Sequence, residues 1–233
     1  DNDGKPELLF SSQKAGFVGY FDIPEDPTQE PWPAENRHMI TDMKNMEGLV
    51  IADLDGDSKN ETLVGSHIFR QQADGTWAEQ VLAKDYAMAR VAVGDFNKDG
   101  VKDIVLTEGD QAPQARVAVF MGPDYKQNLL RSDLFNLHSM DVADFNGDGH
   151  DDIFVGEMGL GENDEEALLI LFINKGDGTF TEALISEGVP THEAKVADLN
   201  GDGRLDIAGK PFQPRNQIDI WLNEIEPAAK STE

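Results

Sequence analysis

A short acidic pattern recurs along this 233-residue chain, and it constrains the fold more than any other feature of the sequence. Each complete copy places Asp, Asn or Glu at positions one, three, five and nine, with a turn-forming residue between them. A partial copy starts at position three. The complete copies span 53–61, 95–103, 144–152 and 198–206, and the partial copy spans 1–7.

Oxygen-bearing side chains at this spacing can converge on one hard cation. Side-chain oxygens at positions one, three, five and nine, with a main-chain carbonyl at position seven, form an oxygen cage where a glycine permits a sharp turn. Calcium accepts about six to eight oxygens in irregular geometry, whereas magnesium demands an octahedron and keeps its waters. We therefore expect four to five Ca2+ ions. The predicted ligands are Asp1, Asp3, Glu7, Asp53, Asp55, Asp57, Lys59, Glu61, Asp95, Asn97, Asp99, Val101, Asp103, Asp144, Asn146, Asp148, His150, Asp152, Asp198, Asn200, Asp202, Arg204 and Asp206, with Lys59, Val101, His150 and Arg204 contributing main-chain carbonyls.

Two simpler interpretations of these loops compete with a calcium site. Asp, Asn and Gly are ordinary turn formers, so a single copy would more often be only a turn. Five copies in register favour metal binding instead. An EF-hand would need a bidentate Glu at position twelve, which is Leu106, Val155 or Gly209 in three of the copies. We expect a structural ion that removes the repulsion among clustered carboxylates.

Short β-branched runs flank every complete loop, which is typical of a hairpin. The runs before the loops are Leu49–Ala52, Val91–Gly94, Met140–Ala143 and Ala194–Ala197, and those after them are Thr62–Val64, Ile104–Leu106, Ile153–Val155 and Ile207–Ala208. Third runs are expected at Phe17–Phe21, Arg116–Phe120, Leu168–Phe172 and Ile218–Trp221. Fourth strands are expected after the Asp-Gly turns at Asp74 and Asp177. Four strands per unit predict the blades of an all-β β-propeller.

The repeat spacing predicts a single β-propeller region of about five four-stranded antiparallel blades over residues 1–233. The approximate blades are 1–46, 47–88, 89–136, 137–190 and 191–233. The first blade lacks its first strand and the last lacks its fourth, so we expect part of a larger propeller of about six to eight blades. A closed five-bladed ring is the alternative.

These units resemble the FG-GAP or VCBS repeats of calcium-stabilised β-propellers. The resemblance rests on the five acidic loops and on the Asp-Gly-Thr-Phe turn at Asp177–Phe180, and it covers essentially the whole chain. It implies a secreted protein, since such repeats occur in integrin α-subunit heads, lectins and polysaccharide-degrading proteins. The Phe-Gly and Gly-Ala-Pro signatures of the integrin form are missing, so integrin-type ligand binding is not implied. Ser58, Glu7 and Glu61 depart from the pattern and predict looser first and second cages.

The net charge of −26 narrows the possible partners. Nucleic acid and anionic membrane surfaces are disfavoured, because binding to them depends on basic patches. The sequence contains no apolar stretch long enough for membrane insertion and no Cys for a disulfide framework. An extracellular, cell-surface or periplasmic location is expected, with further blades or domains of a parent chain beside this region.

A second candidate site is expected at the end of the blades opposite the acidic loops. The start of each first strand and the end of each second strand meet there, near the propeller axis, where ligand pockets commonly lie. A ring of polar residues at this channel mouth predicts a site for a glycan or an extracellular protein ligand. Its members are Glu47, Arg90, Glu108, His138, Glu157, His192, Glu193 and Lys210.

The ring is compatible with binding and with catalysis. We favour a non-catalytic binding or scaffold module, for carbohydrate binding or adhesion, in which polar groups bond sugar hydroxyls and Trp32, Trp77 or Tyr86 stacks on a sugar. The alternative is a polysaccharide lyase. In that case His138 or His192 acts as the general base, while Arg90 or Lys210 neutralises a uronate carboxylate.

Other roles for these residues also stay open. His138, His192, Glu157 and Glu108 could bind a transition metal. A His at a strand start is, however, more often a packing residue, and the ring's cations could simply pair with its acids. Strand patterns favour core positions for Trp77 and Trp221, whereas Trp32 lies in a long Pro-rich loop, where functional residues are common.

Overall fold

The regular secondary structure of the protein, in a computed structural model, is almost entirely β-strand, and the strands form five antiparallel sheets. Residues 3–12, 14–109, 112, 114–160, 164–212 and 217–226 are described. Within these residues the helical structure is limited to two short 3-10 turns, Ala34–Asn36 and Asp164–Glu166. The predicted all-β class is therefore confirmed.

Each sheet is built from strands that are consecutive in the sequence. The three-stranded first sheet holds β1 (Glu7–Ser12), β2 (Phe17–Asp22) and β3 (Arg37–Thr41). The second holds β4 (Leu49–Ala52), β5 (Glu61–Val64), β6 (His67–Gln71) and β7 (Trp77–Val81). The third holds β8 (Arg90–Gly94), β9 (Asp103–Thr107), β10 (Ala115–Met121) and β11 (Lys126–Leu134). The fourth holds β12 (Leu137–Ala143), β13 (Asp152–Glu157), β14 (Leu168–Asn174) and β15 (Phe180–Glu187), and the three-stranded fifth holds β16 (Glu193–Ala197), β17 (Asp206–Lys210) and β18 (Asp219–Trp221).

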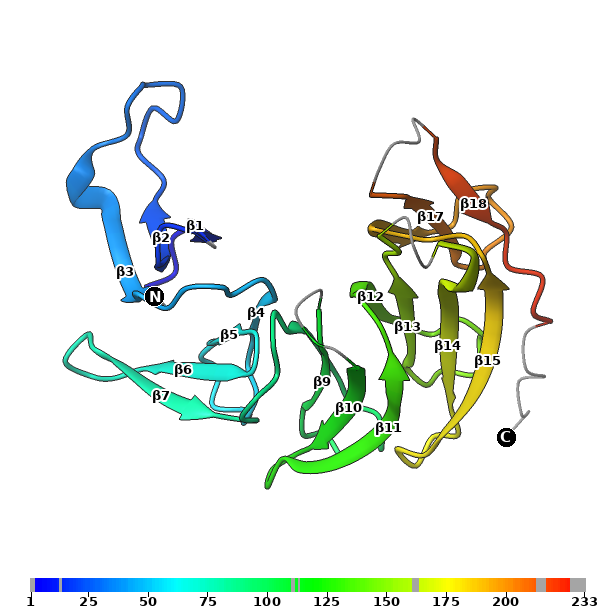
Figure 1. Ribbon diagram of the computed structural model, residues 1–233. Coiled ribbons are helices and arrows are strands. Elements are labelled where there is room, and N and C mark those ends of the chain that lie inside the picture. Colours follow the sequence, from blue (N-terminus) through cyan, green and yellow to red (C-terminus); the bar gives the residue numbers. More distant parts are fainter. Residues whose placement is uncertain are drawn as a thin grey trace.

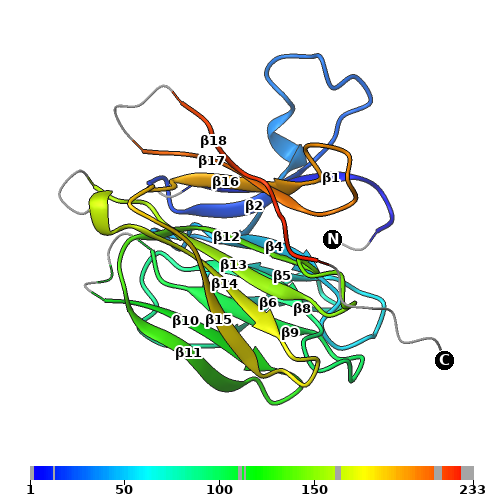
Figure 2. The ribbon, with the colours of Figure 1, turned by 90° about the vertical axis from the view of Figure 1, so that its right-hand side faces the viewer.

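The five sheets follow one another around an open arc, with the first and fifth sheets at its two ends (Figures 1 and 2). In the second to fifth sheets the first strand contacts its counterpart in the next sheet, so β4, β8, β12 and β16 form a continuous row. Small side chains permit this close approach. A Cβ on Gly48, just before β4, would lie only 2.6 Å from the main-chain nitrogen of Val91 on β8.

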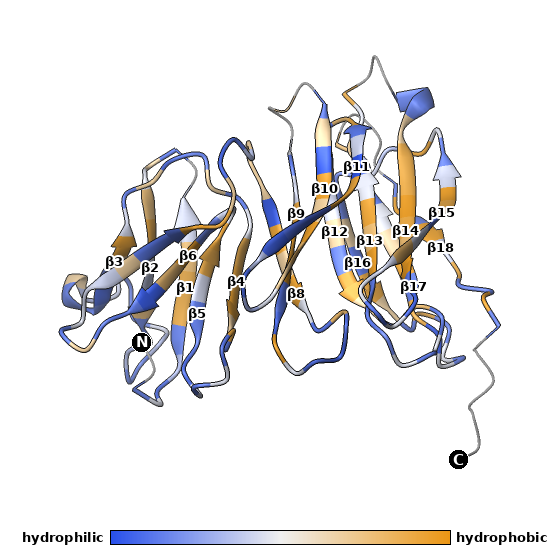
Figure 3. Cartoon of the chain, turned by 90° about the horizontal axis from the view of Figure 1, so that it is seen from below, coloured by the Kyte–Doolittle hydropathy of each residue, from blue (hydrophilic) through white to orange (hydrophobic). Residues whose placement is uncertain are grey.

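Apolar clusters between neighbouring sheets form the core. The cluster between the third and fourth sheets includes Phe96, Val155 and Phe172, and similar clusters join the other neighbouring pairs. Burial on both faces explains why the second strands of the three middle sheets are mostly apolar, because each is covered by a sheet on either side. Figure 3 shows the hydrophobic residues concentrated in strands and the hydrophilic residues in the loops that join them.

The sequence predicted blades of four strands but assigned no residue range to four of the strands. They are β1, β3, β6 and β11. Strands β3 and β11 lie at sheet edges, where several residues are exposed, so the alternation of apolar and polar residues is weak. Only tertiary pairing with β2 and β10 makes these segments recognisable as strands.

The acidic residue at position nine braces the adjoining hairpin in the third, fourth and fifth loops. Asp152 is fully buried, and its carboxylate accepts the Phe145 N–H at 3.0 Å and the Asn174 N–H at 2.8 Å. One bond reaches the loop and the other reaches the end of the third strand, so a single side chain joins three strands. Asp103 and Asp206 make the equivalent pair of bonds.

Removing this carboxylate should destabilise the fold. We expect Asp152→Ala to lower the free energy of unfolding by about 2–5 kcal/mol, since two buried N–H groups lose their acceptor and each unsatisfied group costs about 1–3 kcal/mol. Urea unfolding followed by circular dichroism measures the change. Asp124→Ala, at an exposed turn residue, is the matched control and should change stability by less than about 0.5 kcal/mol. Equal effects of the two substitutions would contradict the bracing role.

Candidate functional site

The acidic loops share one hydrogen-bond pattern, which the fourth loop illustrates. The Asp144 carboxylate accepts the Gly147 N–H at 2.7 Å, the Asp148 N–H at 3.1 Å and the Gly149 N–H at 2.8 Å. Gly149 has a φ of 86°, a conformation that glycine adopts without strain. These bonds fold the loop around the position-one carboxylate.

The side chains at positions three and five lie next to each other in the same loop. Asn146 Oδ1 accepts the Asp148 N–H at 2.9 Å, and Asn146 Nδ2 donates to Asp148 Oδ2 at 2.9 Å. Asp148 Oδ1 accepts the N–H of His150, the position-seven residue, at 2.8 Å. Positions one, three and five thus present their oxygens on one side of a tight turn.

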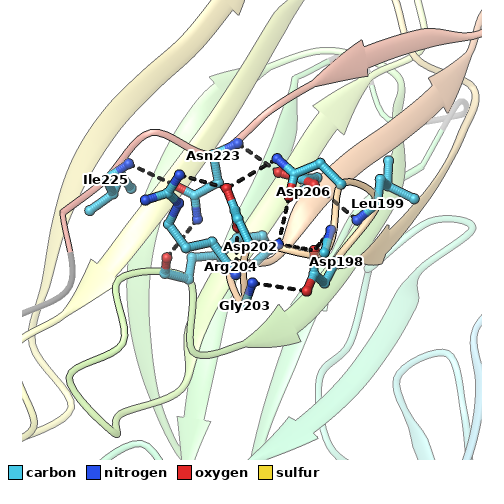
Figure 4. A network of polar contacts seen from close by, with 11 residues as sticks. Asp198, Leu199, Asp202, Gly203, Arg204, Asp206, Asn223 and Ile225 are labelled. Carbon is cyan, nitrogen blue, oxygen red and sulfur yellow. Dashed lines mark hydrogen bonds and ion pairs between the residues drawn. The ribbon is translucent and has the colours of Figure 1, made fainter.

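The other complete loops repeat this arrangement with small variations. Figure 4 shows the fifth loop, in which Asp198 accepts the Gly203 N–H and Asp206 bonds the Asn223 N–H. Bonds of the same kind fold the loops that begin at Asp53 and Asp95. The predicted ligands Asn97, Asp99, Val101, Asn200, Asp202 and Arg204 take part in these bonds.

The second loop carries the greatest concentration of carboxylates. Asp53, Asp55 and Glu61 each place one carboxylate oxygen within 4.8 Å of the other two. Ser58, where the other complete loops have Gly, adopts a φ of 69°, so the turn keeps its shape despite the substitution. Position seven is Lys59, whose N–H donates to Asp57 at 2.8 Å. This donor set is the hard, anionic one that calcium prefers.

The first loop is described only in part. Asp3 accepts the Lys5 N–H at 2.8 Å, as position five does in the complete loops, and Glu7 begins β1. Asp1 lies outside the described residues.

Burial raises the pKa of several position-nine carboxyl groups. Desolvation raises the pKa of Asp152 to about 6, and it also raises the pKa values of Glu61 and Asp103. The nearby carboxylates at positions one and five add to the shift. Each carboxylate oxygen that accepts an N–H retains a second lone pair, so these residues could also face a cation. A divalent ion would offset the cost of keeping them charged.

A polar cavity of about 260 Å3 lies at the opposite end of the sheets, where the inner strands begin. Its lining includes Glu47, Arg90, His138 and Glu193, from the starts of β4, β8, β12 and β16. Lys195 also lines it, a residue that the sequence did not single out. Six of the eight predicted ring residues come together here, since His192 and Lys210 contact the same group.

Arg90 and His138 are tightly engaged with their neighbours. Arg90 Nη2 lies 3.0 Å from Glu47 Oε2 and is close to both ring nitrogens of His138, 2.7 Å from Nε2 and 2.8 Å from Nδ1. His138 Nδ1 donates to the main-chain oxygen of His192 at 2.8 Å. Since the His138 side chain is only 9% exposed, both of its nitrogens are committed to protein partners.

His192 is kept neutral by its surroundings. Its ring stacks on His138 with 4.1 Å between centroids, and Lys210 Nζ donates to His192 Nδ1 at 3.1 Å. Burial, with help from His138 and Lys210, lowers the pKa of His192 to about 4. His138, His192 and Glu193 have ligand atoms within 4.8 Å of one another. However, the two rings are inclined by only 22°, so their in-plane lone pairs do not converge on one metal ion.

The other two predicted ring residues are held in separate buried contacts. Glu108 pairs with Arg116, Nε to Oε2 at 2.6 Å and Nη2 to Oε1 at 2.7 Å. Glu157 accepts the Phe135 N–H at 2.8 Å and the Leu168 N–H at 2.7 Å, and burial raises its pKa. These acids brace neighbouring strands.

The candidate sugar-stacking residues are largely packed. Tyr86 is 8% exposed, with the Arg116 guanidinium over its ring. Trp77 packs between the first two sheets and Trp221 between the last two. Trp32 lies on the long loop before β3, with its edge against Phe21 and its indole N–H donating to the Pro27 carbonyl.

Two asparagines that the sequence did not suggest connect neighbouring sheets at the acidic loops. Asn174 Nδ2 donates to the Phe96 carbonyl at 2.8 Å, and Asn223 Nδ2 donates to the Phe145 carbonyl at 2.7 Å. In each case the side-chain amide at the end of a third strand donates to position two of the acidic loop in the preceding sheet. Their shared place after the third run is the only sequence signal that could have identified them.

Comparisons with known proteins bear on the repeat. No curated protein matches the sequence. A solved structure, that of the V. cholerae biofilm matrix protein Bap1, superposes with a TM-score of 0.49 and 19% identity over 89% of this chain. The chain spans only 32% of the length of that protein's chain. None of the helices in the described residues is long and apolar enough to cross a membrane. The family model of the FG-GAP-like repeat matches residues 144–209, which hold the fourth and fifth acidic loops and the strands between them, in agreement with the repeat that these loops predict.

Proposed function

We propose that this chain is a calcium-stabilised β-propeller region that acts outside the cytoplasm as a non-catalytic binding or scaffold module, in adhesion or in an extracellular matrix. The observation that carries the proposal is the recurrence of one acidic loop, with one hydrogen-bond pattern, in four consecutive sheets. Turn formation alone does not require a carboxylate at so many equivalent positions. Calcium binding accounts for all of them together.

The electrostatics of the loops support a bound ion. The chain carries 26 excess negative charges, and the predicted ligand positions of the loops hold 16 of its 45 Asp and Glu residues. Asp53, Asp55 and Glu61 hold three carboxylate oxygens within 4.8 Å of one another. Like charges at such distances repel by about 1 kcal/mol per pair in water and by several times more near a protein surface. A divalent cation converts this repulsion into attraction.

The arrangement of the sheets supports the propeller. Successive antiparallel sheets lie around an arc, their first strands form the inner row, and their apolar faces pack on one another. Extending this arrangement around the remaining part of a circle requires further sheets. Flanking blades or domains of a parent chain are the partners that we propose for this role.

The polar cavity is the best candidate for ligand binding. Its volume of about 260 Å3 is near the lower end of about 300–1,000 Å3 for ligand pockets. Arg90 offers N–H donors, and Glu47 and Glu193 offer acceptors, a combination that suits the hydroxyl groups of a glycan or the surface of an extracellular protein. Binding accounts for the geometry better than catalysis does, because both nitrogens of His138 are engaged by protein groups.

Calcium should stabilise the fold strongly. At about 100-fold excess over Kd each ion adds about 2.7 kcal/mol. A change of 1 kcal/mol shifts Tm by roughly 2–4 °C for a domain of this size. We therefore expect chelation to lower Tm by more than about 10 °C in differential scanning calorimetry. Native mass spectrometry should show four to five bound ions that chelation removes. Equal Tm values in chelator and in excess calcium would contradict the proposal.

In the calcium-free protein Asp152 should stabilise the fold less and less as the pH rises from about 4 to 6. Because the folded-state pKa of Asp152 is raised to about 6, from 3.8, this group holds more of a proton in the folded state than in the unfolded state within this window. His192 acts in the opposite direction over the same range, since its pKa is lowered to about 4. Denaturant unfolding of the calcium-depleted protein at a series of pH values measures the net slope. Asp152→Asn removes one contribution, so the stability of the variant should change more positively with pH than that of the original chain. Equal slopes for the two chains would refute the assignment.

The cavity should bind a ligand through Arg90. On a glycan array we expect retention that falls at least tenfold in Arg90→Ala, because the guanidinium presents donors at the cavity wall. Arg131→Ala is the matched control, since that arginine pairs with Asp133 on the third sheet, away from the cavity. Binding that survives the Arg90 change, or that falls equally in both variants, would exclude the cavity as the glycan site.

A further inference from the structure

The position-nine acids of the third and fourth loops are joined by a continuous series of hydrogen bonds. Asp103 Oδ2 accepts the Phe96 N–H at 2.9 Å, and the Phe96 carbonyl accepts a bond from Asn174 Nδ2 at 2.8 Å. The main-chain N–H of Asn174 donates to Asp152 Oδ1 at 2.8 Å. Two residues, Phe96 and Asn174, therefore connect the buried carboxylate of one loop with the buried carboxylate of the next.

The same series continues from the fourth loop to the fifth. Asp152 Oδ2 accepts the Phe145 N–H at 3.0 Å, and the Phe145 carbonyl accepts a bond from Asn223 Nδ2 at 2.7 Å. The main-chain N–H of Asn223 donates to Asp206 Oδ1 at 2.8 Å, a bond that Figure 4 includes. Asp152 stands in the middle of the series and takes part in both connections, one through each carboxylate oxygen.

These connections run through the interior of the protein. Asp103, Asp152 and Asp206 are fully buried, as is Phe96, and Asn174 is only 1% exposed. Buried polar groups have no water to replace a lost partner, and hydrogen bonds in a chain polarise one another. A change at one loop is therefore felt by the groups that hold the next loop.

The second loop is not part of this series. Gly122 stands at the end of the third strand of the third sheet, where Asn174 and Asn223 stand in the two following sheets. Its N–H donates to Asp103 Oδ1 at 2.8 Å, as the N–H groups of the two asparagines do to their own acids. Glycine has no side-chain amide to donate to the loop of the preceding sheet, so the series ends at Asp103.

An ion in one loop would order the main chain of its neighbour. Phe96 and Phe145 each follow the leading Asp of their loop directly, so the amide that bonds their carbonyl also fixes the main chain beside the position-one ligand. A loop that is already ordered by its neighbour loses less conformational freedom when it binds its own ion, and this difference produces positive cooperativity.

We propose that Asn174 and Asn223 are positioning residues that couple calcium binding among the third, fourth and fifth loops, whereas the second loop binds its ion independently. This inference rests on the proposed calcium function and goes beyond it, because equivalent loops could equally well fill one by one. Coupling between sites typically changes affinity about 5- to 150-fold, and it is reciprocal.

Hydrogen exchange of each loop, measured by mass spectrometry on the whole chain over a series of calcium concentrations, gives a half-saturating concentration for every loop. Asp198→Ala removes the exposed leading acid of the fifth loop. We expect it to raise the half-saturating calcium concentration of the fourth loop at least fivefold. In a chain that already carries Asn223→Ala, Asp198→Ala should have no further effect on the fourth loop, because the connection is broken. A merely structural role of Asn223 would leave the effect of Asp198→Ala unchanged.

The matched control is Asp53→Ala, which removes the leading acid of the second loop. It should leave the half-saturating concentrations of the third, fourth and fifth loops unchanged. This comparison involves neither asparagine, so it decides the question independently of how well Asn223→Ala folds. A fourth loop that binds calcium equally well with and without Asp198→Ala would overturn the coupling and leave the calcium function standing. Absence of calcium-dependent protection in every loop would overturn both.

Discussion

The bond between a buried carboxylate and two backbone N–H groups is the interaction on which the third, fourth and fifth sheets depend. Asp103, Asp152 and Asp206 lie at the ninth position of their loops, where the second strand begins, and each reaches both the loop and the end of the third strand. Without such an acceptor the buried N–H groups would be unsatisfied, which costs more than an ordinary hydrogen bond contributes. The acid therefore aligns three strands and holds the loop above them.

This constraint also explains why the loops and the core cannot be treated separately. Desolvation of the same carboxylates raises their pKa values, so the ionised form is costly in the absence of a cation. Asn174 and Asn223 connect neighbouring sheets, because each donates to the main-chain carbonyl at position two of the loop in the preceding sheet. A cation in one loop would thus stabilise a hairpin and also the contact between two sheets. The position-nine acids therefore brace the strands and would also hold the proposed cation.

The two ends of the sheets have different physical characters. At the loop edge, closely spaced acids create a field suited to cations. At the opposite end, Arg90 and Lys210 lie among Glu47, Glu193 and two stacked histidines, so positive and negative groups largely compensate. Burial keeps His192 neutral, which removes a charge that would otherwise repel Arg90 and Lys210. A compensated polar surface favours a neutral, hydrogen-bonding ligand over an ion.

The sequence by itself determined the elements whose cause is local. Repeated Asp-x-Asn/Asp-x-Asp loops and their β-branched flanks indicated the hairpins, the all-β class and the FG-GAP-like repeat, because turn chemistry and strand periodicity act within a few residues. It also brought together Glu47, Arg90, His138 and His192 correctly, since equivalent positions of successive repeats must face the same axis.

Only the tertiary structure decided the features that depend on contacts between distant residues. Edge strands such as β3 and β11 have no strong pattern of their own and form by pairing with a neighbour. Glu108 and Glu157 stand at repeat positions like those of the ring, yet partners as far apart as Arg116 and Phe135 hold them away from the cavity. The burial of a side chain depends on the strands and sheets beside it, and the sequence of a single repeat does not specify which these are.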